Sequence, residues 1–209
     1  MTAPVVIVGA SHASVQAIDT LRREGFEGPI TLVGEEPHLP YNRPPLSKKY
    51  LSGELPVERL PLRRQQFFDD AGVNLRLGTR VTALDCGARR LRLNDGNEVS
   101  YDRLILSVGS RPRLLDVPGH QLAGIHYLRN IADVDAIRAG LTAARRVIVV
   151  GAGYIGLEVA ASVKRLGFEV TVLEMADRPM HRVVAPEISR FYTDLHAREG
   201  VQILCNTSV

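Results

Sequence analysis

The stretch VVIVGASHAS (residues 5–14) returns in altered form as VIVVGAGYIG (residues 147–156). Each copy runs on without a gap to a Gly-Phe-Glu triplet, at residues 25–27 and at residues 167–169. Repetition that extends through a strand, a glycine turn and a helix is typical of a duplicated structural unit. The sequence therefore predicts two copies of one α/β unit.

The first copy has the pattern of a buried strand followed by a helix. Residues 5–8 are a continuous β-branched run, which is typical of a strand covered on both faces of a parallel sheet. Apolar residues then recur at helical spacing between Ser11, which can cap the helix, and Gly25, which can end it. Residues 30–33 are expected to form the next strand.

The second copy adds the full glycine pattern of a dinucleotide site. A strand at residues 147–150 leads into Gly151-Ala-Gly-Tyr-Ile-Gly156, and the apolar residues Ile155, Val159, Val163 and Leu166 are expected to share one face of the helix. The next strand, at residues 170–173, ends at Glu174. Glycines allow a tight turn close to a pyrophosphate, and a carboxylate accepts ribose hydroxyls. We assign Gly151, Gly153, Ile155, Gly156 and Glu174 to the dinucleotide; the alternative is a βα turn that is merely tightly packed.

The first copy departs from this pattern. Ser11 and Ser14 replace its second and third glycines, and its acidic residue is Glu35, after Gly34. An acidic ribose ligand in the second copy favours NADH over NADPH, because a 2′-phosphate would lie against a carboxylate. Arg178 and Arg182 lie nearby in the sequence and could relieve that repulsion.

Composition limits the other possibilities. The 209 residues are 45% hydrophobic and 23% charged with a net charge of +3, which is too mildly basic for a nucleic-acid protein. No apolar run approaches the roughly 20 residues that span a bilayer, and the start of the chain lacks a secretory leader, so a cytoplasmic location away from the membrane is expected. Cys86 and Cys205 have no neighbours at metal-ligand or dithiol spacing, so both are expected to be structural and no metal site is predicted.

The segment HLPYNRPPLSK (residues 38–48) carries a family resemblance. Its three prolines exclude a regular helix or a central strand, so a shaped loop is expected. The run RPPLSK after a nucleotide-binding unit resembles the FAD-dependent NADH:ferredoxin reductases of the putidaredoxin, rubredoxin and biphenyl dioxygenase reductase type. Residues 101–112 (YDRLILSVGSRP), 126–129 (HYLR) and 191–201 are similar to their counterparts in that family.

The resemblance implies an α/β fold with two Rossmann-like dinucleotide-binding domains, as in the glutathione-reductase-like FAD- and NAD-linked reductases. Residues 1–112 would form the FAD-binding domain and residues 113–209 an incomplete NAD-binding domain. The segment that returns to the FAD domain and the C-terminal interface domain are not found, so a truncated sequence is expected. The residues implied to hold FAD are Gly9, Ser11, Ala13, Ser14, Glu35, Arg43, Lys48, Val81 and Arg129.

The resemblance also implies roles for two charged residues. Lys48 would lie beside the flavin ring and pair with Glu158, so that its charge stabilises the reduced flavin. The alternatives are that Lys48 is a solvated loop lysine, as Lys49 is expected to be, and that Glu158 lies in the first turn of its helix, where the helix dipole alone favours an acid.

The implied function is electron transfer from NADH through FAD to a [2Fe-2S] ferredoxin or a rubredoxin, which would serve a P450 or a ring-hydroxylating dioxygenase. No cysteine lies in residues 39–51, so disulfide reduction is not expected. One alternative is an NADH oxidoreductase of the apoptosis-inducing-factor type, whose redox state controls binding to other macromolecules. Another is a nucleotide-binding remnant without catalysis.

Overall fold

The computed structural model describes residues 4–209, which divide into two compact units. The first contains the chain up to Asn42 together with Glu58–Ser110, and the second contains Arg43–Val57 together with Arg111–Val209. Each repeated motif lies in its own unit.

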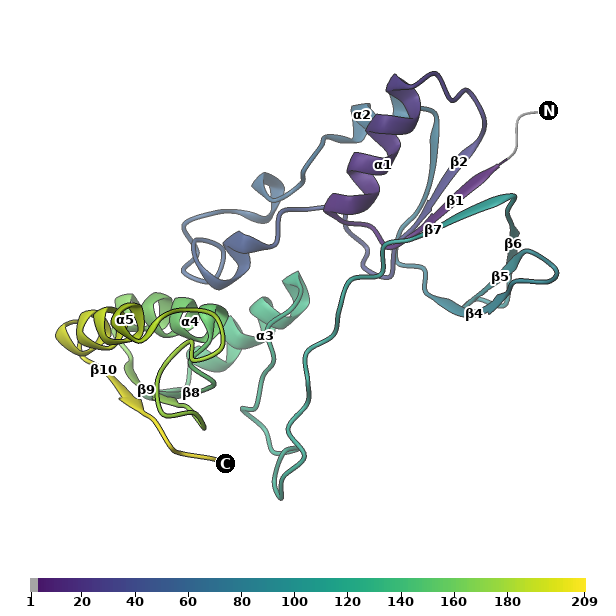
Figure 1. The fold of residues 1–209 in the computed structure, drawn as a ribbon. Helices are drawn as coiled ribbons and strands as arrows, with labels where there is room; N and C mark the ends of the chain where they lie inside the picture. The colour runs from purple at the N-terminus through teal and green to yellow at the C-terminus, as the bar shows by residue number, and fades with distance from the viewer. Residues whose placement is uncertain (1–3) are drawn as a thin grey trace. The chain divides into compact units, whose positions relative to one another are not determined.

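The first unit combines a parallel sheet with a small antiparallel one (Figure 1). The parallel sheet has the strand order β3-β2-β1-β7, and the antiparallel sheet the order β4-β5-β6. The elements of this unit are β1 (Val5–Val8), α1 (His12–Arg23), β2 (Ile30–Val33), α2 (Gln65–Asp70), β3 (Val73–Arg76), β4 (Val81–Asp85), β5 (Arg90–Leu93), β6 (Glu98–Ser100) and β7 (Arg103–Leu106), with the 3-10 turn η2 (Val57–Arg59) at its edge.

Alternate residues of β1 pack into two different cores, which explains why all four of its residues are buried. Val5 and Ile7 pack with Ile18 of α1 and Phe68 of α2. Val6 and Val8 face the other way, against Leu91 and Leu93 of β5. A strand covered on both faces needs apolar residues at every position, as the sequence pattern predicted.

The second unit has a three-stranded parallel sheet of order β10-β9-β8. Its elements are η1 (Pro44–Ser47), α3 (Ile131–Leu141), β8 (Arg146–Val150), α4 (Tyr154–Arg165), β9 (Glu169–Leu173), α5 (Pro186–Arg198) and β10 (Val201–Leu204). Figure 1 shows α4 and α5 together on one face of this sheet. The other face is open, since Ile148 and Val150 of the edge strand β8 are 65% and 49% exposed.

The segment Arg43–Val57 belongs to the second unit although the chain around it belongs to the first. The Tyr50 hydroxyl donates to the Asp135 carboxylate of α3 at 2.8 Å, and the Arg138 guanidinium lies 5.9 Å from the centre of the Tyr50 ring. The Ser162 hydroxyl of α4 donates to the Ser47 carbonyl at 2.8 Å. Side chains of α3 and α4 therefore anchor this segment.

The α/β fold with two strand–turn–helix units is confirmed, with three differences in detail. Of the residues expected to share one face of α4, Val163 is buried together with Leu157 and Ala160, whereas Ile155 and Leu166 are 53% and 43% exposed. The sequence places Cys86 in the strand region after Val81, but it lies in the exposed turn after β4. The proline-rich loop contains the short 3-10 turn η1.

None of the helices within residues 4–209 is both long enough and apolar enough to cross a membrane.

Candidate nucleotide and charge-pair sites

The glycine turn between β8 and α4 leaves open space at its first two glycines. Gly151 has φ +98°, a left-handed conformation that favours glycine, and its N–H donates to the Leu173 carbonyl at 2.7 Å. A Cβ atom added at Gly151 or at Gly153 would have no neighbour within 4 Å. The turn thus presents bare backbone and the first N–H groups of α4 to open space, which is the geometry that binds an anion.

The third glycine has a different task. A Cβ atom at Gly156 would lie 1.9 Å from the Gly151 carbonyl oxygen, far inside any allowed contact. Only a residue without a side chain lets the first turn of α4 pack this closely against the turn that precedes it. Gly156 therefore fixes the position of the helix start relative to Gly151.

Glu174 lies beside this turn, at the end of β9. Its carboxylate accepts hydrogen bonds from the Ala152 N–H at 2.7 Å and from the Ala176 N–H at 2.8 Å. Glu174 and the glycine turn therefore meet at the carboxyl ends of the parallel strands, where nucleotides bind in folds of this kind. The bare turn, the helix start and the carboxylate together fit a dinucleotide.

The first glycine turn uses serine where the second uses glycine. Gly9 has φ +106°, and a Cβ atom there would lie 2.2 Å from the Ser107 carbonyl oxygen, so glycine is required. Ser14 is fully buried; its hydroxyl accepts from the Ser11 N–H at 2.9 Å and donates to the Ser11 carbonyl at 2.7 Å. Ala13 faces solvent beside them. The serine is therefore accommodated within the helix start, which stays accessible at Ala13.

The acidic residue of the first unit is displaced for a packing reason. A Cβ atom at Gly34 would lie 2.6 Å from the Cβ of Ala10, so no side chain fits at the position that corresponds to Glu174. The next residue, Glu35, is exposed, and its carboxylate lies 3.6 Å from the Arg80 guanidinium. The Thr79 N–H donates to the Gly34 carbonyl at 2.8 Å, which brings the start of β4 and Val81 to this corner.

Four side chains of the second unit form a connected polar cluster. The Lys48 ammonium lies 2.6 Å from Oε2 of Glu158, and the Ser47 hydroxyl donates to the same oxygen at 2.5 Å. Lys48 also donates to the Pro44 carbonyl at 3.2 Å, and Ser162 holds the Ser47 backbone. The Lys48 and Glu158 side chains are 44% and 33% exposed, so their ion pair adds little to stability. Its geometry is nevertheless fixed from several directions.

Two arginines expected at the cofactor also lie in the second unit. The Arg43 guanidinium donates to the backbone carbonyl of Arg129 at 2.8 Å, and the Arg129 N–H donates to the Asp133 carboxylate at 2.8 Å. Both arginines are half-buried. These contacts link the start of the proline-rich loop to the start of α3.

The predicted residues thus fall into separate groups. Gly9, Ser11, Ala13 and Ser14 form the first turn, with Glu35 and Val81 at the end of β2; Gly151, Gly153, Ile155, Gly156 and Glu174 surround the second turn; and Lys48 contacts Glu158. Glu158 is the fifth residue of α4, beyond the first turn, which contains no acidic residue. The alternative that the helix dipole alone accounts for an acidic residue at position 158 is therefore weaker than the sequence suggested.

Sequence reasoning missed two serines. Ser47 was part of the RPPLSK motif without a role of its own, and Ser162 carried no signal, because its partner is 115 residues away in the chain. Both hydroxyls are buried and hydrogen-bonded. Among the described residues, no group of three or more His, Cys, Asp or Glu side chains could hold a metal ion.

Known proteins resemble this chain along its whole length. Residues 3–209 match the family model of the pyridine nucleotide-disulphide oxidoreductases. The chain is 43% identical over 205 residues to a rhodocoxin reductase of Rhodococcus erythropolis. The matched region covers 98% of this chain and 48% of that protein.

Solved structures give the same result. The chain superimposes on the reductase of a covalent putidaredoxin reductase–putidaredoxin complex with a TM-score of 0.91 and 41% identity, over 99% of this chain and 50% of that one. A ferredoxin reductase from Rhodopseudomonas palustris matches with a TM-score of 0.93 and 40% identity, over 98% of this chain and 50% of that one. The chain spans about half the length of the relatives that it matches.

The glycine turn predicts a contrast between two alanine substitutions. Gly156→Ala should lower the free energy of unfolding by about 1–3 kcal/mol, because α4 must shift to clear the Gly151 carbonyl. Gly153→Ala is the matched control: its φ of −76° suits alanine and its Cβ would meet open space, so stability should stay within about 0.5 kcal/mol. Urea denaturation of the three proteins measures both values, and equal stability of the two variants would contradict the packing role of Gly156.

The environment of Cys205 predicts a pH dependence. Burial raises the pKa of the Cys205 thiol, and the carboxylates of Glu174 and Asp177 raise it further. Because the thiolate is the reactive form, alkylation by iodoacetamide in a Cys86→Ser background should set in at higher pH than for a free cysteine peptide. Glu174→Gln should move that midpoint back toward the peptide value, since one negative charge is removed. A midpoint at or below that of the peptide would contradict this account.

Proposed function

Because the chain belongs to the pyridine nucleotide-disulphide oxidoreductase family, we propose that it carries electrons from NADH to FAD, which passes them to a small iron-sulfur carrier. The resemblance to FAD-dependent ferredoxin reductases that the RPPLSK segment indicated is confirmed by relatives of about 42% identity. The single observation that carries the proposal is the joint presence of two glycine turns and the Lys48–Glu158 pair on one chain.

The second unit is the proposed site of NADH. Open backbone at Gly151 and Gly153 and the free start of α4 suit a diphosphate, with the exposed Ile155 beside it. The Glu174 carboxylate, which accepts two backbone N–H groups here, has the chemistry to accept ribose hydroxyls. A carboxylate at that place favours a ribose without a 2′-phosphate.

The first unit is the proposed site of the adenosine diphosphate half of FAD. The start of α1, with Gly9, Ser11, Ala13 and Ser14, would face the diphosphate, since Ser14 is satisfied locally and leaves Ala13 exposed. Glu35 would accept ribose hydroxyls in place of its ion pair with Arg80, with the Val81 backbone near the adenine. Arg43 and Arg129 are proposed as further cofactor ligands.

Lys48 is proposed as the electrostatic partner of the flavin. The chemistry that FAD supplies when bound is the acceptance of an electron pair as hydride and its release one electron at a time. The ammonium of Lys48 would balance negative charge that develops beside it, and no proton transfer is needed. Glu158 and Ser47 hold the ammonium in place, which keeps the charge oriented before the reaction.

The proposed electron acceptor is a [2Fe-2S] ferredoxin or a rubredoxin that serves a P450 or a ring-hydroxylating oxygenase. Relatives are named for such systems, among them a putidaredoxin reductase and a benzene 1,2-dioxygenase ferredoxin reductase, both of Pseudomonas putida. The net charge of +3 would favour encounter with an acidic carrier.

A visible spectrum tests the cofactor assignment. Purified protein incubated with FAD and freed of excess should retain flavin absorbance, and NADH should bleach it while NADPH does so at higher concentration. Gly153→Ala should weaken NADH binding at unchanged stability, because its methyl group enters the space proposed for the diphosphate. A wild-type protein that takes up no FAD would refute the proposal.

Replacement of Lys48 tests its role. Lys48→Ala should slow the reduction of bound flavin by NADH about tenfold, as expected for the loss of one oriented charge, with a much smaller change in NADH affinity. Lys49→Ala is the matched control, because Lys49 is the exposed neighbour and should change neither quantity. Stopped-flow reduction over a range of NADH concentrations separates the rate from the affinity. Equal losses in both would remove the assigned role of Lys48.

A further inference from the structure

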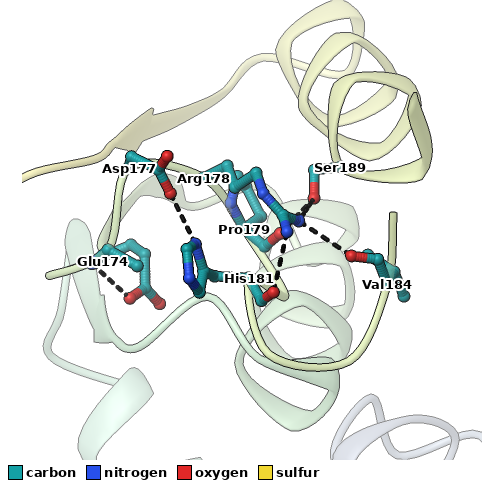
Figure 2. A network of polar contacts seen from close by, with 8 residues as sticks. Glu174, Asp177, Arg178, Pro179, His181, Val184 and Ser189 are labelled. Carbon is teal, nitrogen blue, oxygen red and sulfur yellow. Dashed lines mark hydrogen bonds and ion pairs between the residues drawn. The ribbon is translucent and has the colours of Figure 1, made fainter. Parts of the chain in front are cut away.

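The loop between β9 and α5 contains an arginine that is bound into the loop itself. Figure 2 shows the Arg178 guanidinium directed toward Ser189 and Val184. One terminal nitrogen donates to the Val184 carbonyl at 3.0 Å and to the Ser189 hydroxyl at 2.7 Å, and the other donates to the His181 carbonyl at 2.9 Å. Arg178 thus ties the middle of this loop to its C-terminal part and to the first turn of α5.

Ser189 accepts its hydrogen bond from Arg178 in a buried position. The residue is 1% exposed, and its hydroxyl donates to the Pro179 carbonyl at 2.6 Å, so the lone pairs of that hydroxyl remain to accept from Arg178. If Arg178 swung out, the buried Ser189 hydroxyl would keep only its bond to Pro179, and the Val184 and His181 carbonyl groups would lose this donor. Because hydrogen bonds from a charged group are stronger than those from a neutral one, these three contacts hold the guanidinium where it is.

The same loop also carries two carboxylates, those of Glu174 and Asp177. Glu174 binds the backbone of the glycine turn, and the Asp177 carboxylate lies 2.7 Å from the His181 ring (Figure 2). Burial raises the pKa of the nearby Cys205 thiol, and the negative charges of both carboxylates raise it further. The loop therefore binds its arginine internally and leaves the Glu174 carboxylate at the glycine turn.

We propose that Arg178 is a positioning residue for dinucleotide binding: it fixes the loop that follows Glu174 and lies against Ala152 of the glycine turn, and it is itself withheld from a 2′-phosphate. The inference rests on the proposed binding of NADH at the second glycine turn and goes beyond it. On this proposal Arg178 does not relieve the repulsion of a 2′-phosphate, and of Arg178 and Arg182 only the exposed Arg182 is available for it.

Two dinucleotides distinguish this role from that of a phosphate ligand. Dissociation constants for NADH and NADPH are measured for the wild type, Arg178→Ala and Ser189→Ala. Both variants should weaken the two dinucleotides by a similar factor of about fivefold, with an unchanged NADPH/NADH ratio, because the loop loosens. Arg190→Ala is the control, since Arg190 is an exposed arginine of α5 that forms an ion pair with Glu187, and it should change neither constant.

Limited proteolysis gives a readout that needs no nucleotide. Trypsin should cut after Arg182 faster in Arg178→Ala and Ser189→Ala than in the wild type or Arg190→Ala, because the loop has lost its internal tie. Unchanged cleavage in both variants would overturn the positioning role. If Arg178→Ala does not fold, Ser189→Ala carries both measurements.

The outcomes distinguish a failure of the role inferred for Arg178 from a failure of the proposed NADH binding by the second unit. Selective loss of NADPH binding in Arg178→Ala, with NADH unaffected, would overturn the inference and identify Arg178 as a phosphate ligand. Failure of the wild type to bind either dinucleotide would instead refute the proposed function of the second unit, while proteolysis would still decide whether Arg178 holds the loop.

Discussion

The contact between Gly156 and the Gly151 carbonyl is the constraint on which the second unit depends. It draws the start of α4 against the preceding turn, which leaves bare backbone at Gly151 and Gly153. The same placement sets Glu158 one position beyond the first helical turn, within reach of the η1 segment and its lysine. The absence of a side chain at Gly156 thus positions both the glycine turn and the Lys48–Glu158 pair, the two features on which the proposed redox function rests.

The two repeats reach related geometries through different packing. In the second, the position after the strand carries Glu174, whose carboxylate binds the N–H of Ala152 in the turn. In the first, the methyl group of Ala10 fills the corresponding space, so Gly34 follows the strand and the acidic residue moves to Glu35. One unit therefore holds its carboxylate against the turn, whereas the other exposes it to Arg80 at the surface.

The local pattern of the sequence predicted most of the fold. The strands at residues 5–8 and 30–33 and the helix ends near Gly25 and Gly167 follow from β-branched runs and glycine positions, which act over a few residues. The sequence pattern did not show which side of α4 is buried, because tertiary packing decides this: α4 buries Leu157 and Ala160, and Ile155 faces solvent. The Ser47–Ser162 bond joins distant parts of the chain, so no local pattern could reveal it. The Lys48–Glu158 contact was expected only from the family resemblance.

The packing of Arg43–Val57 on α3 and α4 has a consequence for the covalent layout of the protein. The chain passes from one unit to the other three times, after Asn42, after Val57 and after Ser110. No single scission can therefore yield two intact halves: a fragment that starts at Arg111 would lose the Tyr50 and Ser47 anchors, and one that ends at Ser110 would keep that segment without its support. The two units are thus interleaved along the polypeptide, and neither corresponds to one continuous block at an end of the sequence.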